Sequence, residues 1–125
     1  MTNPAVYPLS WVRGTTTPIR FAMRRNGVPI PFDDVRFTVS TKQGQMLFRA
    51  TYADDGGITV VNPSTGMMQF TPTAAQTRLM IESKDGITAK NKYEIEYRNG
   101  QDEEVYLMGD IVAIGGINDD EEEPS

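Results

Sequence analysis

The segment RGTTTPIRFAMRRNGVPI, residues 13–30, contains the pattern that decides the fold. In its middle, the apolar side chains of Ile19, Phe21 and Met23 alternate with basic side chains and alanine. A period of two residues predicts a strand with one face buried and one face exposed, as in antiparallel sheets. The dipeptide Asn26–Gly27 then predicts a tight turn, because both residue types tolerate a positive φ.

The same alternation recurs along the chain, separated by Gly, Asn and Pro. It predicts further strands in residues 34–41, 46–52, 58–61, 67–72, 92–98 and 102–114. Residues 28–32 contain two prolines, which restrict them to an edge strand or a connection. Thr73 followed by Gln76 forms the pattern of a capping box and predicts one short helix that crosses between sheets. About seven short strands with such spacing are typical of a β-sandwich or a small barrel.

The last two strands are expected to form a hairpin. A two-residue turn at Asn99 and Gly100 would place Glu104 opposite the apolar Ile95. We therefore predict a three-residue loop, residues 99–101, which pairs Ile95 with Val105, because a one-residue slip moves every side chain to the other face. Gly109 is interpreted as a bulge near the end of the last strand.

The chain of 125 residues has the length of one domain and contains neither cysteine nor histidine. This composition excludes disulfides and thiolate metal sites, and it removes the commonest general base and metal ligand. The first residues lack the pattern of a signal peptide, and no apolar run is long enough to span a bilayer. We expect no membrane association, no cofactor and no enzymatic activity.

Charge is distributed unevenly. Five acidic residues gather near the C-terminus: Asp119, Asp120, Glu121, Glu122 and Glu123. The other 12 acidic residues balance the 12 lysines and arginines. Residues 1–49 carry a net charge of +5 and residues 50–118 a net charge of −5. Copies of the chain can associate through opposite charges if the fold separates the two halves; if their strands interleave, the asymmetry cancels.

The sequence divides into an extended arm (residues 1–12), a β-sandwich (residues 13–117) and an acidic tail (residues 118–125) that we expect to be disordered. In the arm, prolines disfavour helix, and Tyr7 and Trp11 are aromatic. We expect these two side chains to pack either on the chain's own core or on a neighbouring molecule.

Residues 13–41, with an Arg-Gly-x-Thr start, an alternating strand, a polar-Gly turn and a second alternating strand, resemble the opening of an Ig-like module of tailed-bacteriophage virion proteins. The N-terminal domain of the baseplate upper protein is the best-known example. Residues 54–80 are similar to its paired strands and Thr-led helical turn. Residues 91–114 are similar to its terminal tyrosine-rich hairpin, including the Leu-x-Gly-x-Ile ending.

The resemblance implies an all-β fold: an Ig-like antiparallel β-sandwich of about seven strands with one short helical crossover. It also implies a virion structural protein, an adaptor or attachment module of the tail, baseplate or neck. Its partners would be other virion proteins and copies of itself, and it would be made in the host cytoplasm. The alternatives are a capsid decoration protein of the same fold and a small carbohydrate-binding β-sandwich, which would expose aromatic side chains.

Four arginines are candidates for a partner surface: Arg20, Arg24, Arg25 and Arg36. If they share the outer face of adjacent strands, they form a basic stripe. No aromatic residue is interleaved with them, so we expect an acidic protein surface rather than a nucleic acid to bind there. The alternative interpretation is a solvated face without a partner.

Two acidic groups are weaker candidates. Asp33, Asp34 and residues 54–57 contain oxygen ligands suited to calcium, but their spacing is not that of an EF-hand loop, and solvated turns explain them as well. The second group consists of the glutamates of the terminal hairpin, Glu94, Glu96, Glu103 and Glu104, whose residue type is that of a glycosidase pair. We expect them on the exposed face instead, where they keep the strands soluble.

Overall fold

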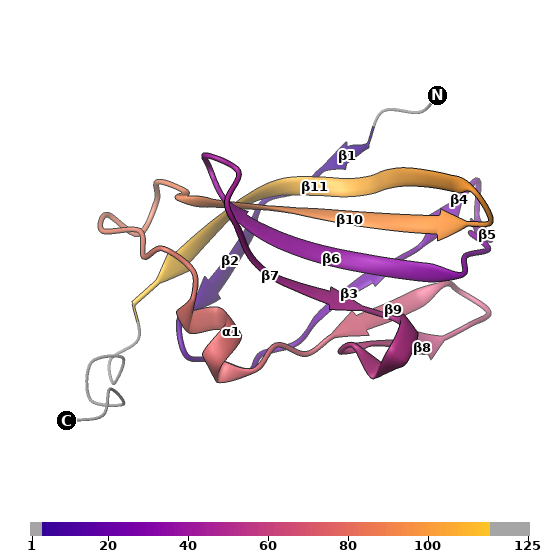
Figure 1. The fold of residues 1–125 in the computed structure, drawn as a ribbon, viewed down its shortest axis with the longest axis horizontal. Coiled ribbons are helices and arrows are strands. Elements are labelled where there is room, and N and C mark those ends of the chain that lie inside the picture. Colours follow the sequence, from indigo (N-terminus) through magenta and orange to yellow (C-terminus); the bar gives the residue numbers. More distant parts are fainter. Residues whose placement is uncertain (1–3, 116–125) are drawn as a thin grey trace.

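The computed structural model describes residues 4–115, which form two β-sheets packed face to face (Figure 1). The first sheet has the order β1-β11-β10-β6-β7, and β2 is also paired with β11. Its strands are β1 (Ala5–Val6), β2 (Leu9–Val12), β6 (Asp34–Thr41), β7 (Met46–Thr51), β10 (Asn91–Asn99) and β11 (Asp102–Ile114). The second sheet has the order β3-β9-β8 and consists of β3 (Ile19–Ala22), β8 (Ile58–Asn62) and β9 (Met67–Phe70).

Shorter elements connect the sheets. A hairpin of β4 (Arg24–Arg25) and β5 (Val28–Pro29) turns at Asn26 and Gly27, whose φ angles of 54° and 77° confirm the predicted turn. A 3-10 turn, η1 (Ala53–Asp55), links β7 to β8.

Helix α1 (Ala74–Arg78) leads from β9 in the second sheet to β10 in the first. The Thr73 side chain accepts a hydrogen bond from the Gln76 amide, and the Gln76 side chain accepts one from the Thr73 amide. The predicted capping box and helical crossover are therefore confirmed.

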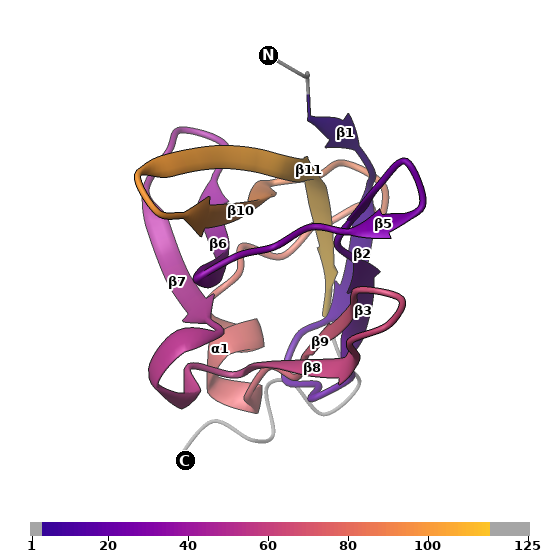
Figure 2. The same cartoon turned by 90° about the vertical axis from the view of Figure 1, so that its right-hand side faces the viewer.

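The strand order is that of an Ig-like sandwich. Strands β11, β10, β6 and β7 take the positions called G, F, C and C′ in this fold, and β3, β9 and β8 take the positions B, E and D. The all-β, Ig-like class that we predicted is confirmed. The sheets are not antiparallel throughout, because β1 and β2 both pair with β11 in parallel. Figure 2 shows β1 and β2 beside β11, at the edge where the two sheets approach each other.

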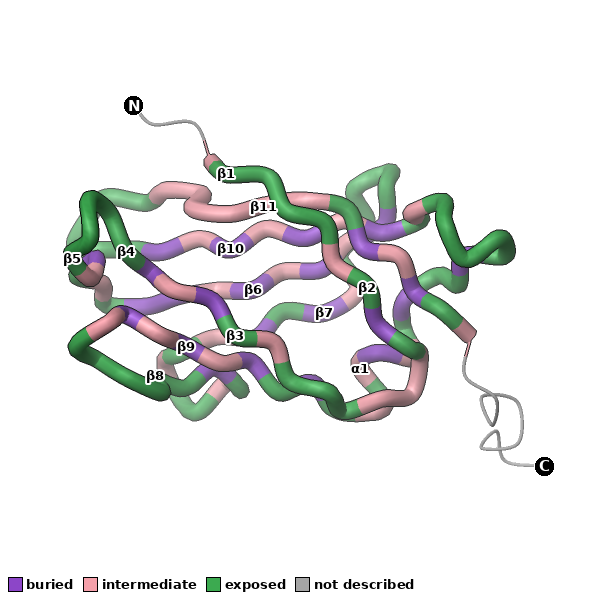
Figure 3. The backbone as a smooth tube through the Cα atoms, turned by 180° about the vertical axis from the view of Figure 1, so that it is seen from behind, coloured by how far each residue is buried: buried purple, intermediate pink, exposed green. Residues whose placement is uncertain are grey.

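The core lies between the sheets. Buried and half-buried residues alternate along β6 and β10 (Figure 3). Val35, Phe37 and Val39 on β6 are fully buried, which confirms the predicted orientation. Aromatic rings join the layers: Phe37 stacks on Tyr93 of the same sheet at 5.4 Å and packs against Phe70 of the second sheet at 5.1 Å. The chain contains no cysteine, so these aromatic contacts join the two sheets without a disulfide.

The hairpin of β10 and β11 differs from our prediction. Asn99 pairs with Asp102, so the loop has two residues, and Tyr106 is an extra residue in β11 that shifts the register by one. Beyond this bulge Ile95 pairs with Leu107. The predicted pairing of Ile95 with Val105 was wrong because a bulge, which a sequence pattern does not reveal, corrects the register within the strand.

Gly109 is not the bulge that we expected. It pairs regularly with Tyr93, and a Cβ atom at this position would overlap the main-chain carbonyl group of Tyr7. The glycine therefore permits close approach of the arm to β11 rather than a break in the ladder.

The predicted arm is extended, but it is not separate from the sandwich. Residues 9–12 form β2, and Trp11 is buried, with its indole Nε1 donating a hydrogen bond of 3.1 Å to the Thr17 carbonyl. Of the two alternatives for Trp11, packing on the chain's own core is the one that the structure shows. Residues 1–3 and the acidic tail lie outside the described residues.

Candidate interaction surface

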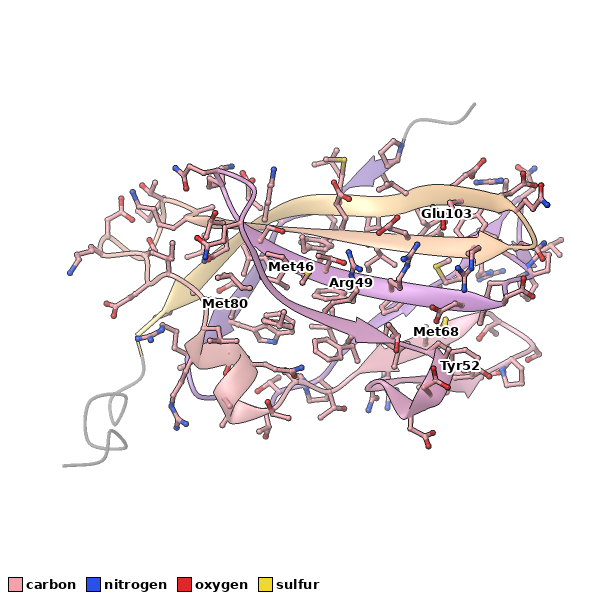
Figure 4. The ribbon with its side chains drawn as sticks, in the orientation of Figure 1. Met46, Arg49, Tyr52, Met68, Met80 and Glu103 are labelled. Atoms are coloured by element: carbon pink, nitrogen blue, oxygen red, sulfur yellow. The ribbon has the colours of Figure 1, made fainter. Side chains whose placement is uncertain are left out.

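The outer face of the first sheet carries rows of opposite charge. The Arg36 Nη2 atom lies 3.2 Å from the Glu103 carboxylate and 3.8 Å from that of Glu96, across β6, β10 and β11. Lys42 and Asp110 form a second pair at 2.6 Å. Figure 4 shows Glu103 on this face. Exposed pairs of this kind contribute little to stability, about 0–1 kcal/mol each, so their main effect is a solvated surface with alternating sign.

The predicted basic stripe does not exist. Arg20 lies on β3 in the second sheet, whereas Arg36 lies on β6 in the first. Arg24 and Arg25 lie on the β4–β5 hairpin, which carries the chain from one sheet to the other. Two of these guanidinium groups bind locally: Arg20 donates to the Gln69 side chain at 2.8 Å, and Arg24 donates to the Gly27 carbonyl at 3.2 Å.

The charge asymmetry between the two halves of the chain cancels in the fold. The pairs of Arg36 and Lys42 each join a cation from residues 1–49 to acids from residues 50–118, and the same holds for Arg25 with Glu104. Strands from the two halves lie side by side in the first sheet. The interleaved alternative is therefore correct, and opposite charge between halves does not provide two faces for association.

A polar cluster fastens the β4–β5 hairpin to the end of the sandwich. The Tyr97 hydroxyl donates a hydrogen bond of 2.7 Å to Glu104 Oε2, and Arg25 Nη2 approaches the same oxygen at 3.1 Å. The hydrogen bond from Tyr97 and the contact with Arg25 lower the pKa of Glu104, and the bond to Glu104 raises the pKa of Arg25. Burial raises the pKa of Tyr97.

This cluster corrects one expectation about the glutamates. Glu94, Glu96 and Glu103 alternate on the outer face, as predicted, but Glu104 pairs with the inward-facing Tyr97 and lies on the inner side of the sheet. The two-residue loop causes this, because it aligns Glu104 with Tyr97 rather than with an outward residue.

Two of the candidate calcium ligands, Asp33 and Asp34, accept hydrogen bonds from main-chain amides. Asp33 Oδ2 accepts a hydrogen bond of 2.6 Å from the Gly100 amide, and Asp34 Oδ1 accepts one of 3.0 Å from the Ala53 amide. Asp54 and Asp55 adopt positive φ angles in η1. Within residues 4–115, no three side chains of the metal-ligating types come together.

Asp85 organises the loop between α1 and β10. Its carboxylate accepts hydrogen bonds from the Ile87 and Thr88 amides at 2.8 and 2.7 Å and from the hydroxyls of Ser83 and Thr88. The bonds from Thr88, followed by those from Ile87 and Ser83, hold the pKa of Asp85 well below its usual range. These contacts are local and stabilise the loop itself.

Two apolar side chains of the N-terminal arm are exposed. Val6 and Tyr7 are 74% and 60% exposed, although both are attached to β11 by main-chain contacts. The Tyr7 amide donates to the Met108 carbonyl at 2.9 Å, and the buried Tyr93 donates its hydroxyl to the Tyr7 carbonyl at 2.6 Å. Burial raises the pKa of Tyr93 to about 12.

A shallow hollow lies beside the arm on the outer face of the first sheet. It is lined by Pro4 of the arm, by Glu94 of β10, and by Val105, Met108 and residues 101–104 of β11 and its loop. Apolar atoms form part of its wall, and carboxylates stand around them.

Sequence reasoning missed Tyr106. As the bulge residue, it points toward the β4–β5 hairpin, and its hydroxyl lies 2.7 Å from the Ala22 carbonyl, to which it donates, and 3.3 Å from the Arg24 amide, from which it accepts. The sequence shows a tyrosine at this position of the last strand. It gives no signal for the hydrogen-bond partner, the Ala22 carbonyl, which lies more than 80 positions away in the chain.

Comparison with known proteins gives little guidance. No protein-family model and no curated protein matches the chain. Among solved structures, the chain is similar to an extracellular domain of the voltage-gated sodium channel β4 subunit, from a study of parallel homodimers and their role in cell–cell adhesion. The identity is 9%, the TM-score is 0.43, and the alignment covers 94% of this chain and 98% of that one. A likeness at this level carries no argument about function.

Among the described residues, no helix has both the length and the apolar character needed to cross a membrane.

Proposed function

We propose that this chain is a structural protein of a tailed-bacteriophage particle, an adaptor or attachment module of the tail, baseplate or neck. It acts by association with other virion proteins and with copies of itself, and not by catalysis. The observation that carries the proposal is the resemblance of residues 13–41, 54–80 and 91–114 to the Ig-like module of such particles. A fold alone does not fix a function, so the fold serves only as a test of compatibility.

The structure is compatible with this role in two respects. The Asn26–Gly27 turn and the Thr73 capping box, which are part of the resemblance, occur where the pattern requires them. The first sheet presents a broad, solvated outer face, and its edge carries an arm with the exposed apolar residues Val6 and Tyr7. A module that works by contact needs such a rigid body and an exposed apolar site.

The test is the composition of the particles. We expect the chain among the proteins of virions produced by the genome that encodes it, detected by mass spectrometry of gradient-purified particles. Immunogold labelling should place it at the tail, baseplate or neck. If purified heads without tails carry the protein, the capsid decoration alternative replaces the proposal. If the protein is expressed but is absent from particles, both interpretations are wrong.

A further inference from the structure

The tripeptide Arg-Asn-Gly occurs twice in the sequence, at residues 25–27 and 98–100, and each copy lies at the turn of a hairpin. An asparagine that precedes glycine is prone to deamidation, since glycine has no side chain to shield its main-chain nitrogen from the asparagine side chain. The two tripeptides are identical, so the fold decides any large difference in their reactivity.

Deamidation at such a site is a reaction with water alone. The glycine amide loses its proton, and its nitrogen forms a bond to the asparagine Cγ atom. The bond from Cγ to the side-chain nitrogen breaks, and that nitrogen leaves with the electron pair and a proton as ammonia. Water then opens the five-membered imide at either carbonyl and restores the proton to the main-chain nitrogen. The product is aspartate or isoaspartate.

The Asn26–Gly27 turn leaves the reacting atoms accessible. The β4–β5 hairpin has two registered pairs, and residues 24–28 are all exposed. Within residues 4–115, neither the Gly27 amide nor the Asn26 side chain forms a hydrogen bond. So short a hairpin opens readily, which allows the side chain to turn toward the amide nitrogen. The Arg24 Nη2 atom lies 3.2 Å from the Gly27 carbonyl oxygen, and a nearby cation favours the amide anion that attacks.

At the second tripeptide a carboxylate holds the reacting amide. The Gly100 amide donates a hydrogen bond of 2.6 Å to Asp33 Oδ2, and the Asp33 amide donates one of 2.7 Å to the Arg98 carbonyl. These two bonds fix the peptide groups on both sides of Asn99, the last residue of strand β10. The bond to Asp33 engages the proton that must leave, and the negative charge of Asp33 disfavours an anion at the same nitrogen.

We infer that Asn26 is a site of spontaneous deamidation in the folded protein and that Asp33 protects Asn99 from the same reaction. A folded molecule therefore changes with age at Asn26 and keeps its asparagine at Asn99. Water is the only co-reactant, so this site is independent of the proposed function.

The product changes the β4–β5 hairpin. Both aspartate and isoaspartate place a new carboxylate near Arg24, and isoaspartate also inserts its Cβ atom into the main chain of the turn. A regular two-residue turn then no longer joins Arg25 and Val28, which are registered partners. We expect faster hydrogen exchange in residues 24–29 of an aged sample than of a fresh one.

The test follows both asparagines in one sample of the full-length protein. The folded chain is kept at mildly alkaline pH, and tandem mass spectrometry of its peptides measures the conversion of each asparagine to the acid over time. We expect Asn26 to react several-fold faster than Asn99. The same chain unfolded in urea is the control, and there the two asparagines should react at similar rates. Equal rates in the folded chain, or a faster reaction at Asn99, would overturn the inference.

The variant Asp33→Ala tests the protection. Loss of its carboxylate should raise the rate at Asn99 several-fold, while the rate at Asn26 stays the same and reports that the fold persists. The matched control is Asp102→Ala, which removes a carboxylate of the same hairpin that accepts no hydrogen bond from residues 4–115. Thermal unfolding checks that both variants are folded. If Asn99 remains slow in Asp33→Ala, or if Asp102→Ala accelerates it equally, Asp33 does not protect this site.

Discussion

The hydroxyl of Tyr93 donates a hydrogen bond of 2.6 Å to the main-chain carbonyl of Tyr7, although 86 positions separate the two residues. The ring of Tyr93 is stacked on Phe37 in the core, so one side chain connects the core to an exposed strand. The position of the arm is therefore set by the core packing of β10, and changes at Tyr93 or in its surroundings should affect the arm directly.

Replacement of Gly109 by alanine should release the arm. The new Cβ atom would overlap the Tyr7 carbonyl group, while the strand backbone at this position can accept alanine. We expect a loss of about 1–3 kcal/mol in the free energy of unfolding, the value of two or three hydrogen bonds, and faster hydrogen exchange at the Tyr7 amide. Gly115→Ala is the control, because its Cβ meets only the Glu82 side chain. Unchanged exchange at Tyr7 would contradict the role of Gly109.

Stability should fall at alkaline pH through Tyr93. Its pKa is raised from 10.0 to about 12, so its contribution is complete below pH 10.0 and is lost as the pH rises toward 12. Tyr93→Phe should lower stability at neutral pH, because the bond to Tyr7 disappears, and should flatten the alkaline decline. Urea unfolding at increasing pH measures both effects. An equally steep decline in Tyr93→Phe would show that other groups cause it.

Removal of the Tyr106 hydroxyl should loosen the β4–β5 hairpin. Tyr106→Phe keeps the ring but removes the hydrogen bonds to the Ala22 carbonyl and from the Arg24 amide. We expect a loss of about 1–2 kcal/mol, with faster hydrogen exchange in residues 24–29. Tyr52→Phe, which keeps the ring contact with Phe32, is the matched control and should change stability little. Equal effects of the two substitutions would argue against a specific anchor.

Truncation of Phe37 should strongly lower the stability of the fold. Its ring contacts aromatic side chains of both sheets, including Phe70 and Tyr93, and no part of it is exposed. Phe37→Ala should cost about 3–5 kcal/mol, the sum of lost burial and a cavity. Val28→Ala on the exposed hairpin is the comparison and should stay within about 0.5 kcal/mol. Calorimetry measures the free energy of unfolding of both variants. A loss for Phe37→Ala as small as that for Val28→Ala would contradict the central role of this ring.

Asp85 should contribute to stability only when it is ionised. Because its folded pKa lies below the ordinary value of 3.8, the contribution is complete above that pH and is lost as the pH falls below it. Asp85→Asn should therefore be less stable than the parent at neutral pH, and the difference should close in acid. Thermal unfolding across this range tests it, with Asp102→Asn, an exposed carboxylate at the start of β11, as control. A difference that persists in acid would assign the effect to geometry rather than charge.

The local sequence predicted the elements well because their signals are short-range. Alternation of apolar residues located the strands and the buried sides of Val35, Phe37 and Tyr93, since the period of a strand is two whatever its partner. The turn at residues 26–27 and the cap at Thr73 were visible because side-chain chemistry alone favours these conformations.

The register of β11 and the placement of the four arginines depend instead on which distant strands pair with each other. The bulge at Tyr106 shifts the register of β11 after a two-residue loop, so that inward positions change from the phase of Glu104 before the bulge to the phase of Leu107 after it. The prediction assumed one continuous alternation along this strand and therefore missed the shift. The four arginines were grouped because their strands were neighbours in sequence, whereas β3 and β6 belong to different sheets.

By itself, the sequence determined which residues enter strands, which turn, and which side of each strand avoids water, because these choices depend on backbone conformation and the spacing of apolar groups. Only the tertiary structure decided that Trp11 lies in the core while Tyr7 lies outside, and that opposite charges from the two halves meet across strands. Those outcomes depend on which strands become neighbours, and that is settled by the joint packing of both sheets rather than by any one segment.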